Sequence, residues 1–478
     1  MFASVESNLL FPLLPHALTV CGALLAILAL SRLLGEKRQP TNTLAWLLGI
    51  LLIPYVCVPL FFLLGGRKLR ARAARKGRFV PRLPAARAVA PETLLIPTVH
   101  AVTTAGAGDP AGGNAIRLLT TGQQTFGEFE EGILSARKSI HIATFILGRD
   151  ATGRRLVQLL AKRAAEGVKV RLLLDAVGCV FVGKRFLAPL VRAGGRTVRF
   201  MPVFPFSTSG SANLRNHRKI AVFDGARAII GGHNLAAEYM GPTFRKKRWA
   251  DFGLAVAGPG AALLNEVFIA DWSFASGENA DALRAESDPL AVAPAGAGDV
   301  HVVASGPDVA GDPLYEGIVS MVQECRQSVW IITPYFIPDE VLLRSLIVKA
   351  RAGKDVTLIV PARSNHRVAD YARRNYVRQL HAAGARVLFY RRGMMHTKAV
   401  IVDERVALAG SANFDLRSLF VNFEIGLMLY SGNDVLAMRR WAGELVRHCD
   451  EPTPDELRRR RFAGDLAEDL CRLLAPLL

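Results

Sequence analysis

The sequence predicts an α/β protein: two fused α/β/α domains related by a pseudo-two-fold axis, preceded by a two-helix hairpin at the N-terminus. Three observations favour this fold. Strand and helix patterns alternate through most of the chain, their order in the first half recurs in the second, and two long apolar runs lie near the start. The expected boundaries are 1–90, 91–274, 275–299 (a Gly/Ala/Pro-rich linker) and 300–478.

The two apolar runs are long enough to cross a bilayer as helices. They extend from Leu9 to Ser31 and from Gln39 to Gly66 without a charge, and the predicted spans are about 9–31 and 41–65. A helix of about 20 apolar residues crosses the hydrocarbon core. A signal peptide is the alternative for the first run and a buried core helix for the second. The first run lacks a preceding basic segment and a small-residue cleavage site, so we expect a transmembrane hairpin.

Basic residues dominate the segment that follows the second run. Between residues 67 and 87 there are nine Arg or Lys and no acidic residue. The positive-inside rule therefore predicts a multi-pass protein of the inner (plasma) membrane, with its C-terminal part in the cytoplasm. The same segment and the net charge of +19 predict anionic partners, such as anionic membrane lipid, a phosphorylated substrate or nucleic acid.

The six cysteines are scattered, with no C-x-x-C pair. We therefore expect neither a disulfide framework nor a zinc site. No group of carboxylates and histidines has the spacing of a metal site either, so the predicted chemistry uses no metal and no cofactor.

Alternating β-rich and helical patterns indicate a duplicated α/β unit. In the first half, strand patterns fall at Ser139–Leu147, Val168–Asp175 and Thr197–Pro202, and helical patterns at 126–138, 151–167 and 186–194. In the second half, strand patterns fall at Ser328–Phe336, Asp355–Pro361 and Ala385–Tyr390, and helical patterns at 313–327, 339–353 and 366–383.

Each half then contains a copy of one motif, which reads NHRKIAVFDGARAIIGGHN in the first half and MHTKAVIVDERVALAGSAN in the second. One H-x-K-x4-D motif is a weak signal, but two copies at equivalent positions of a repeated fold are a strong one. The downstream Gly and Asn match as well. The matched residues are His217, Lys219, Asp224, Gly231 and Asn234, and His396, Lys398, Asp403, Gly410 and Asn413.

These residue types suit phosphodiester chemistry. Residues two apart in an extended strand point to the same face, so each His and its Lys would project together into one pocket between the halves. The Lys ammonium groups and the amides of Asn234 and Asn413 would stabilise phosphate oxygens. One imidazole would attack phosphorus, and the other would act as general acid and base.

Carboxylates are needed to orient the two imidazoles. Asp251 and Glu424 each open the strand after the motif of their half, so we predict that they accept a hydrogen bond from the far imidazole nitrogens. The motif carboxylates, Asp224 and Asp403, are counted with the candidate catalytic residues. They end the motif strands, however, and we expect them to brace the following turn rather than act in the chemistry.

With these residues in place, the chain resembles the phospholipase D superfamily. More narrowly, it resembles the bacterial cardiolipin synthases of the two-span type over nearly its full length. Further matching segments are PTNTLAWLLGILLIP in the hairpin, RNHRK, GGHNLAAEY, ASGPD, TPYFIPDE, SANFDLRS and the closing CRLLAPLL. Two segments depart from the usual family pattern, namely Thr144–Phe145 and the run WADFGLAV, which still keeps Asp251.

The resemblance implies a metal-independent reaction in two steps. By similarity, His217 is the nucleophile and His396 the acid and base. One phosphatidylglycerol gives its phosphatidyl group to the enzyme with loss of glycerol, and a second phosphatidylglycerol accepts it to give cardiolipin. The motifs leave open whether phosphatidylethanolamine takes part.

Two other functions use the same motif residues. A hydrolytic phospholipase D would accept water instead of a lipid hydroxyl, and the motifs alone do not separate the two, because water exclusion depends on pocket shape. A nuclease would suit the charge of +19, but the predicted hairpin and the basic residues beside it argue against a nucleic-acid partner. An inactive scaffold would be expected to lack motif residues, and all of them are present.

Overall fold

The computed structural model describes residues 20, 22–31, 40–58, 76, 89–202, 214–287, 292–457, 468 and 471. The chain divides into two compact units. One comprises Met1–Gly77 with Ser211–Asn213, and the other comprises Arg78–Gly210 with Leu214–Leu478.

The first unit contains helix α2, which covers Pro40–Leu52. Ala29, Ile50 and Val58 form its small buried cluster. Within the described segments, no helix is both long and apolar enough to cross a membrane. The predicted spans, 9–31 and 41–65, lie partly outside the described residues. The hairpin therefore remains a prediction.

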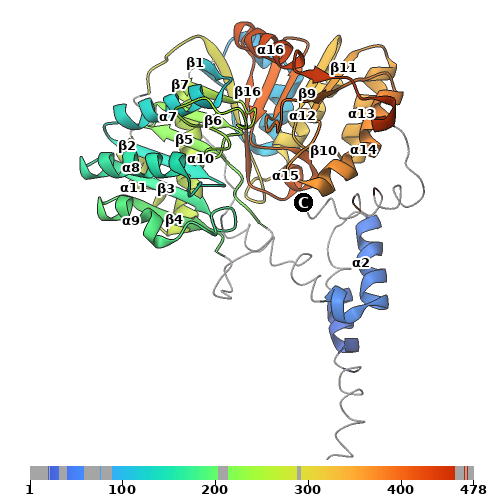
Figure 1. Ribbon diagram of the computed structural model, residues 1–478, viewed down its shortest axis with the longest axis horizontal. Helices are drawn as coiled ribbons and strands as arrows, with labels where there is room; N and C mark the ends of the chain where they lie inside the picture. The colour runs from blue at the N-terminus through green and yellow to red at the C-terminus, as the bar shows by residue number, and fades with distance from the viewer. Residues whose placement is uncertain are drawn as a thin grey trace, which may run out of the picture. The chain divides into compact units, whose positions relative to one another are not determined.

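The second unit is built on a sheet of 15 strands that runs through both halves of the chain (Figure 1). Its order is β17-β12-β11-β9-β13-β14-β16-β8-β1-β7-β6-β5-β2-β3-β4. Read outward from the central β8–β1 pair, the first half runs β1-β7-β6-β5-β2-β3-β4, and the second half runs β8-β16-β14-β13-β9-β11-β12. The two halves thus repeat the same strand order, as expected for a duplicated α/β unit with pseudo-two-fold symmetry.

The strands of the first half are β1 Ala111–Leu119, β2 Ser139–Thr144, β3 Lys169–Asp175, β4 Arg196–Phe200, β5 Ile220–Phe223, β6 Arg227–Gly231 and β7 Gly253–Ala257. Those of the second half are β8 Gly298–Ser305, β9 Ser328–Ile332, β11 Asp355–Pro361, β12 Arg386–Tyr390, β13 Ala399–Val402, β14 Val406–Gly410, β16 Glu424–Leu429 and β17 Cys449–Asp450. A separate parallel pair consists of β10 Phe336–Ile337 and β15 Phe414–Asp415.

Helices cover the sheet. Those of the first half are α5 Pro91–Leu94, α6 Pro97–Val102, a π-helical turn at Thr103–Ala107, α7 Gly122–Ser135, α8 Ala151–Ala165, α9 Lys184–Arg192, α10 Pro259–Ser276 and α11 Ala280–Ser287. Those of the second half are α12 Pro313–Glu324, α13 Glu340–Arg351, α14 Arg367–Ala382, α15 Leu416–Phe420, α16 Gly432–Val446 and α17 Pro454–Leu457.

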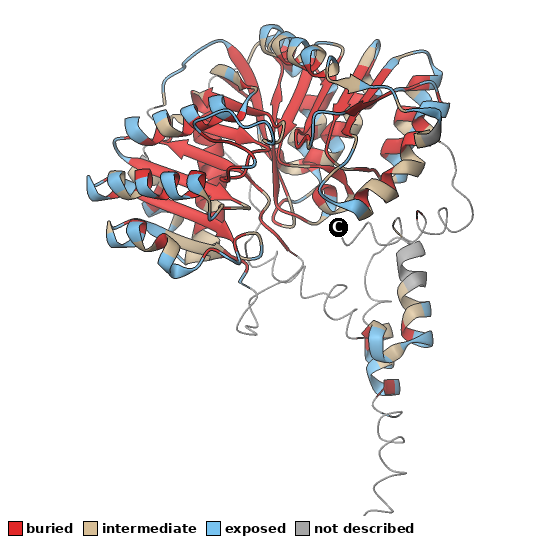
Figure 2. Cartoon of the chain, viewed as in Figure 1, coloured by how far each residue is buried: buried red, intermediate tan, exposed pale blue. Residues whose placement is uncertain are grey.

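Burial explains why the strands read as continuous apolar runs. Apart from the edge strands β4 and β17, most strands are buried along much of their length, whereas the helices other than α10 keep an exposed outer face (Figure 2). Three helices begin at a polar capping residue: the side chains of Thr121, Asp150 and Asp339 accept backbone hydrogen bonds at the first turns of α7, α8 and α13. One hydrophobic cluster contains residues of both halves, so the halves share a core as well as a sheet.

Asn114 joins the halves at the centre of the sheet. Its amide nitrogen donates to the carbonyl oxygens of Ala111 (2.8 Å) and Gly298 (3.0 Å), and its amide oxygen accepts from the backbone nitrogen of Gly260 (2.6 Å). One buried side chain thereby connects β1, β8 and the start of α10.

The predicted α/β fold and its duplication are confirmed, and the six predicted strand segments overlap β2, β3, β4, β9, β11 and β12. The described part of the segment predicted as a linker, 275–299, contains α11 and the start of β8. Sequence analysis also overlooked the central strand β1 and the buried helix α10, whose largely apolar surface has little helical periodicity.

Candidate active site

The two motif histidines lie in extended segments that cross from one half to the other. His217 precedes β5, and its backbone nitrogen donates to the carbonyl oxygen of Phe423 (2.9 Å), which lies in the second half. The backbone nitrogen of His396 donates to the carbonyl oxygen of Ala250 (2.7 Å), in the first half. Each motif segment is therefore paired with the segment that carries the other half's predicted orienting carboxylate.

This exchange gives each imidazole a carboxylate from the opposite half. The Nδ1 atom of His217 lies 2.9 Å from Oε1 and 3.0 Å from Oε2 of Glu424. The Nδ1 atom of His396 lies 2.8 Å from Oδ2 of Asp251. The structure therefore brings Asp251 and Glu424 to the histidines, and the pairing is crossed.

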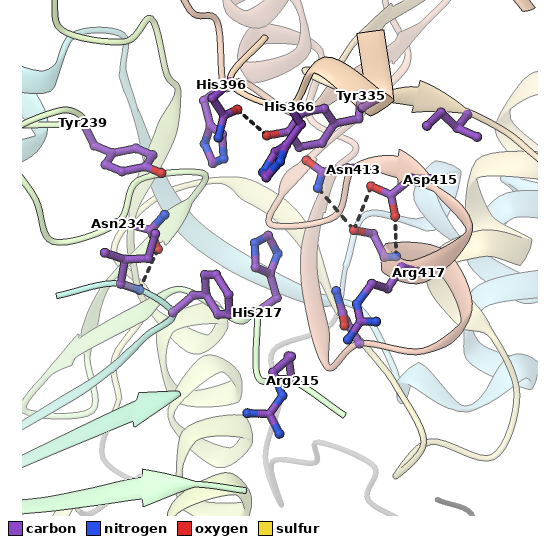
Figure 3. A pocket seen from close by; sticks show the side chains of 17 residues that line it. Arg215, His217, Asn234, Tyr239, Tyr335, His366, His396, Asn413, Asp415 and Arg417 are labelled. Carbon is purple, nitrogen blue, oxygen red and sulfur yellow. Dashed lines mark hydrogen bonds between the residues drawn. The ribbon is translucent and has the colours of Figure 1, made fainter. Parts of the chain in front are cut away.

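Both imidazoles line one pocket of about 290 Å³ between the halves, and Figure 3 shows them with Asn234 and Asn413 around the same space. The amide oxygen of Asn234 accepts from the backbone nitrogen of Ile146 (3.1 Å). The amide nitrogen of Asn413 lies 3.3 Å from the hydroxyl of Ser418. The predicted gathering of two His and two Asn side chains around one space is thus present.

The motif lysines lie behind the histidines rather than on the pocket wall. Lys219 and Lys398 are buried, and each ammonium group donates to the backbone carbonyl of its own histidine. The Nζ atom of Lys398 also lies 2.9 Å from Nδ1 of His396. Their charges are therefore held next to the pocket in a region with little water.

Burial favours the neutral form of both histidines. It lowers the pKa of His217, and it lowers that of His396 well below the ordinary value, with the charges of Lys398 and Lys219 acting in the same direction. Glu424 behaves differently: burial acts to raise its pKa, but His217, Lys219 and the Ser411 hydroxyl lower it overall. An ionised Glu424 beside a neutral His217 accepts a hydrogen bond from Nδ1–H, which leaves Nε2 with a free electron pair.

The other carboxylate, Asp251, has a raised pKa because it is buried. Burial also lowers the pKa of Lys219 to about 8 and that of Lys398 to about 7. The two halves of the site are therefore electrostatically unequal, although their motifs match.

A buried arginine fixes the arrangement on the His217 side. Arg218 is fully buried, and its guanidinium contacts Asp271 (2.7 Å) and Asp308 (3.2 Å). It also donates to the carbonyl oxygens of Glu424 (3.0 Å) and Ser305 (3.1 Å). Sequence analysis missed this network, although the Arg between His217 and Lys219 was visible, because the partners of a buried Arg cannot be read from the motif.

Further pocket residues break the symmetry between the halves. The first half contributes Phe145, whose ring lies edge-on to His217 with centroids 5.0 Å apart, together with Arg215 and Tyr239. The second half contributes polar residues of the β15–α15 region and of the β9–α14 side. These are Tyr335, Asn365, His366, Asp415, Arg417, Ser418 and Asn422. Comparing the two halves of the sequence does not find these residues, because most of them differ in type from the residue at the matching position of the other half.

The motif carboxylates lie away from the pocket. The carboxylate of Asp224 accepts from three consecutive backbone nitrogens, those of residues 137–139, at 2.7–2.9 Å. The carboxylate of Asp403 accepts in the same way from residues 326–328, at 2.6–2.8 Å. Both residues adopt a left-handed backbone with φ of 52°. Their positions therefore do not support a catalytic role. The two carboxylates hold the turns that precede β2 and β9, and not the turn after the motif strand that the sequence predicted.

Comparison with known proteins places these features in a family. Residues 130–262 and 318–446 match the family described as "Cardiolipin synthase, PLD-like domain". Residues 24–66 match the "Phospholipase_D-nuclease N-terminal" family. The chain is 34% identical over 463 residues to the cardiolipin synthase of Geobacillus kaustophilus and 33% identical over 462 residues to cardiolipin synthase 1 of Bacillus anthracis. Each alignment covers 93% of this chain and 90% of the relative.

The chain belongs to the cardiolipin synthase family. The phosphatidylserine synthase of Haemophilus influenzae has a similar fold, with a TM-score of 0.58 and 17% identity over 76% of this chain and 93% of that one. At this identity the likeness concerns the fold alone. The predicted family, the phospholipase D superfamily, is thus confirmed by the sequence matches.

The contacts of Asp224 and Asp403 predict a stability defect when either is changed to Ala. Each change leaves three backbone N–H groups without their acceptor, so we expect a loss of about 2–4 kcal/mol in the free energy of unfolding. Activity per folded molecule should stay within about tenfold of the unaltered protein. Thermal unfolding and activity assays on both variants test this, with Asp281→Ala, an exposed carboxylate, as the control. A loss of activity beyond 1,000-fold at unchanged stability, which is about 4 kcal/mol of transition-state free energy, would contradict it.

Proposed function

We propose that this synthase-family chain is a phosphatidyltransferase that makes cardiolipin from two phosphatidylglycerol molecules and releases glycerol. The observation that carries the proposal is the pair of crossed His–carboxylate contacts in one pocket, His217 with Glu424 and His396 with Asp251. Such a pocket offers a nucleophile and a general acid on facing sides of one phosphodiester. The named relatives, which align over 93% of the chain, support the choice of lipid.

In the first step, Nε2 of His217 attacks phosphorus and the bond from phosphorus to the glycerol oxygen breaks. His396 enters this step as the imidazolium, a form that the negative charge of the bound phosphodiester favours, and gives its Nε2 proton to that oxygen, so that glycerol leaves. His217 becomes positively charged in the covalent phosphatidyl-histidine, and the ionised Glu424, which accepts a hydrogen bond from Nδ1–H of His217, offsets that charge. The lowered pKa of Glu424 suits this task and favours His217 as the nucleophile.

In the second step, His396 removes the proton from a hydroxyl group of the second phosphatidylglycerol. The oxygen attacks phosphorus, the bond from phosphorus to His217 breaks, and cardiolipin is released. Asp251 orients His396 in both steps. Lys219, Lys398, Asn234 and Asn413 stabilise the negative oxygens around phosphorus as the charge shifts. Neither step needs a metal ion or a cofactor.

Hydrolysis by the same intermediate is the second candidate. Water in place of the lipid hydroxyl would give phosphatidic acid, and the same six His, Lys and Asn side chains would serve. The asymmetric polar wall of the second half, which includes Tyr335, Asp415 and Ser418, favours recognition of a second head group over water.

Purified protein in detergent should convert labelled phosphatidylglycerol into cardiolipin and free glycerol. His217→Ala should abolish both the product and the covalent phosphatidyl-enzyme trapped by rapid acid quenching, since it removes the attacking nitrogen. Thin-layer chromatography and mass spectrometry of the quenched protein report the two results. Phosphatidic acid as the sole product would contradict the synthase, and an adduct that persists in His217→Ala but is lost in His396→Ala would reverse the two roles.

Activity should fall as the pH rises through neutrality. The lysines stabilise phosphate oxygens only when protonated, and their lowered pKa values, about 8 for Lys219 and about 7 for Lys398, bring the loss of charge to this range. We therefore expect kcat/KM to decline between about pH 7 and 8. The acid limb should lie below about pH 6.5, because burial lowers the pKa of His217, which must be neutral to attack. A kcat/KM that stays constant up to pH 9 would contradict the assignment.

We further propose that residues 1–90 anchor the enzyme in the plasma membrane as a transmembrane hairpin, with residues 91–478 in the cytoplasm. A reporter enzyme that is active only outside the cytoplasm should be active when inserted in the 32–38 loop and inactive when fused after residue 478. Activity at the second position but not the first would invert this orientation, and inactivity at both would argue against the hairpin.

A further inference from the structure

The loop between β3 and α9 exposes large apolar side chains beside basic ones. Within residues 176–183, the side chains of Val180 and Phe181 are 59% and 80% exposed. Lys184 and Arg185 follow at the exposed start of α9, and residues 176–192 contain no acidic side chain. We refer to residues 176–185 as the β3–α9 loop.

The β3–α9 loop is attached to the wall of the pocket. The thiol of Cys179 donates to the carbonyl oxygen of Phe145 and accepts from the backbone nitrogen of Leu147, each at 3.3 Å. Phe145 in turn lines the pocket beside His217. The exposed tip, residues 180–181, therefore lies one or two residues from a fixed point at the site.

A second loop, residues 241–249, has the same character. Phe244 is 78% exposed, and the exposed residues Arg245, Lys246 and Lys247 follow it. This segment also lacks acidic residues. We refer to it as the basic loop.

The basic loop is fixed to the other imidazole. Trp249, its last residue, lies with its ring centroid 5.7 Å from that of His396 and 4.9 Å from that of Tyr239, a pocket residue. Its backbone nitrogen donates to the carbonyl oxygen of Glu238 (2.8 Å). Each histidine thus has, in its immediate surroundings, the base of a loop with an exposed Phe and basic side chains.

An exposed Phe in a loop that has basic side chains and no acidic ones fits the interface of an anionic bilayer. The ring enters the region between head groups and acyl chains, and the cations remain at the level of the phosphates. The proposed substrate has its phosphodiester at that level and its acyl chains in the bilayer. A pocket that takes in such a head group must lie close to the membrane surface.

Resting on the proposed function, we infer that the β3–α9 loop and the basic loop dock the catalytic unit onto an anionic phospholipid bilayer, with Phe181 and Phe244 inserted beside the pocket. The membrane contact of the catalytic unit is then separate from any anchor at the N-terminus. It places the bilayer surface beside both His217 and His396.

Photolabelling tests the contact on the full chain. The protein is reconstituted in vesicles of phosphatidylglycerol and phosphatidylcholine that contain a little phosphatidylcholine with a photoactivatable acyl chain. Mass spectrometry should find label in residues 176–185 and 241–249. It should find none on the outer face of α13, where Val348 is equally accessible at 62% exposure. Labelling of both loops at or below the level around Val348 would overturn the inference.

Substitutions test whether the contact matters for turnover. Phe181→Ser with Phe244→Ser should lower turnover of phosphatidylglycerol in vesicles by about tenfold or more, because two large apolar groups are lost from the interface. The same variant should retain turnover, within about twofold, of a short-chain phosphatidylglycerol dissolved as monomers. Val348→Ser is the control and should change neither rate. An equal loss on both substrates would show that the loops support the site itself and not the membrane contact.

The two experiments also separate this inference from the proposed function. Labelled loops in a protein that makes no cardiolipin would leave the docking surface in place and remove the proposed reaction. Cardiolipin synthesis by a protein whose loops remain unlabelled would support the proposed reaction and rule out the docking surface.

Discussion

The site depends on one interaction repeated twice: an imidazole from one half of the chain is hydrogen-bonded to a carboxylate from the other. His217 contacts Glu424, and His396 contacts Asp251. Backbone pairing between the same segments fixes both contacts, since His217 donates to Phe423 and His396 to Ala250. Neither half could orient its own histidine in this way, so the duplicated fold is needed for a complete site.

The shared sheet and core hold the two His–carboxylate contacts between the halves in a fixed geometry. β1 and β8 join the halves, Asn114 connects them to α10, and buried apolar side chains of both halves form one cluster. Arg218 links the halves by polar contacts, because its guanidinium contacts two buried carboxylates and donates to the carbonyl oxygen of Glu424. Fixed hydrogen-bonding groups in a site with little water stabilise developing charge without reorganisation during the reaction.

Matching motifs do not make the two sides chemically equal. Glu424 has a lowered pKa and Asp251 a raised one, although they occupy equivalent positions. The neighbours differ as well, since Arg218 of the first half corresponds to Thr397 in the second. This inequality gives a physical basis for assigning different tasks to the two histidines.

The fold and much of the site could be predicted because they leave periodic or repeated signals. The strands appear as apolar runs, and the motif offsets identify His217 and His396 as equivalents. The crossed pairing could not be predicted, since it depends on which segments meet across the centre of the sheet. The positions of Lys219 and Lys398 behind the imidazoles, and the unmatched pocket residues such as Asp415 and Arg417, are likewise set by three-dimensional packing.

Single-turnover formation of the phosphatidyl-enzyme in Glu424→Gln and Asp251→Asn tests the crossed pairing most directly, with the adduct mapped to the peptide that contains His217. Amide replacement of the orienting carboxylate costs about 10⁴ in kcat in the Ser-His-Asp triad. We expect that Glu424→Gln slows the attack and leaves little adduct. In Asp251→Asn the adduct on His217 should form more slowly but persist, because both its formation and its transfer to the second hydroxyl need His396. If Asp251→Asn prevents the adduct on His217 and Glu424→Gln lets it accumulate, each carboxylate serves the histidine of its own half and the crossed site is contradicted.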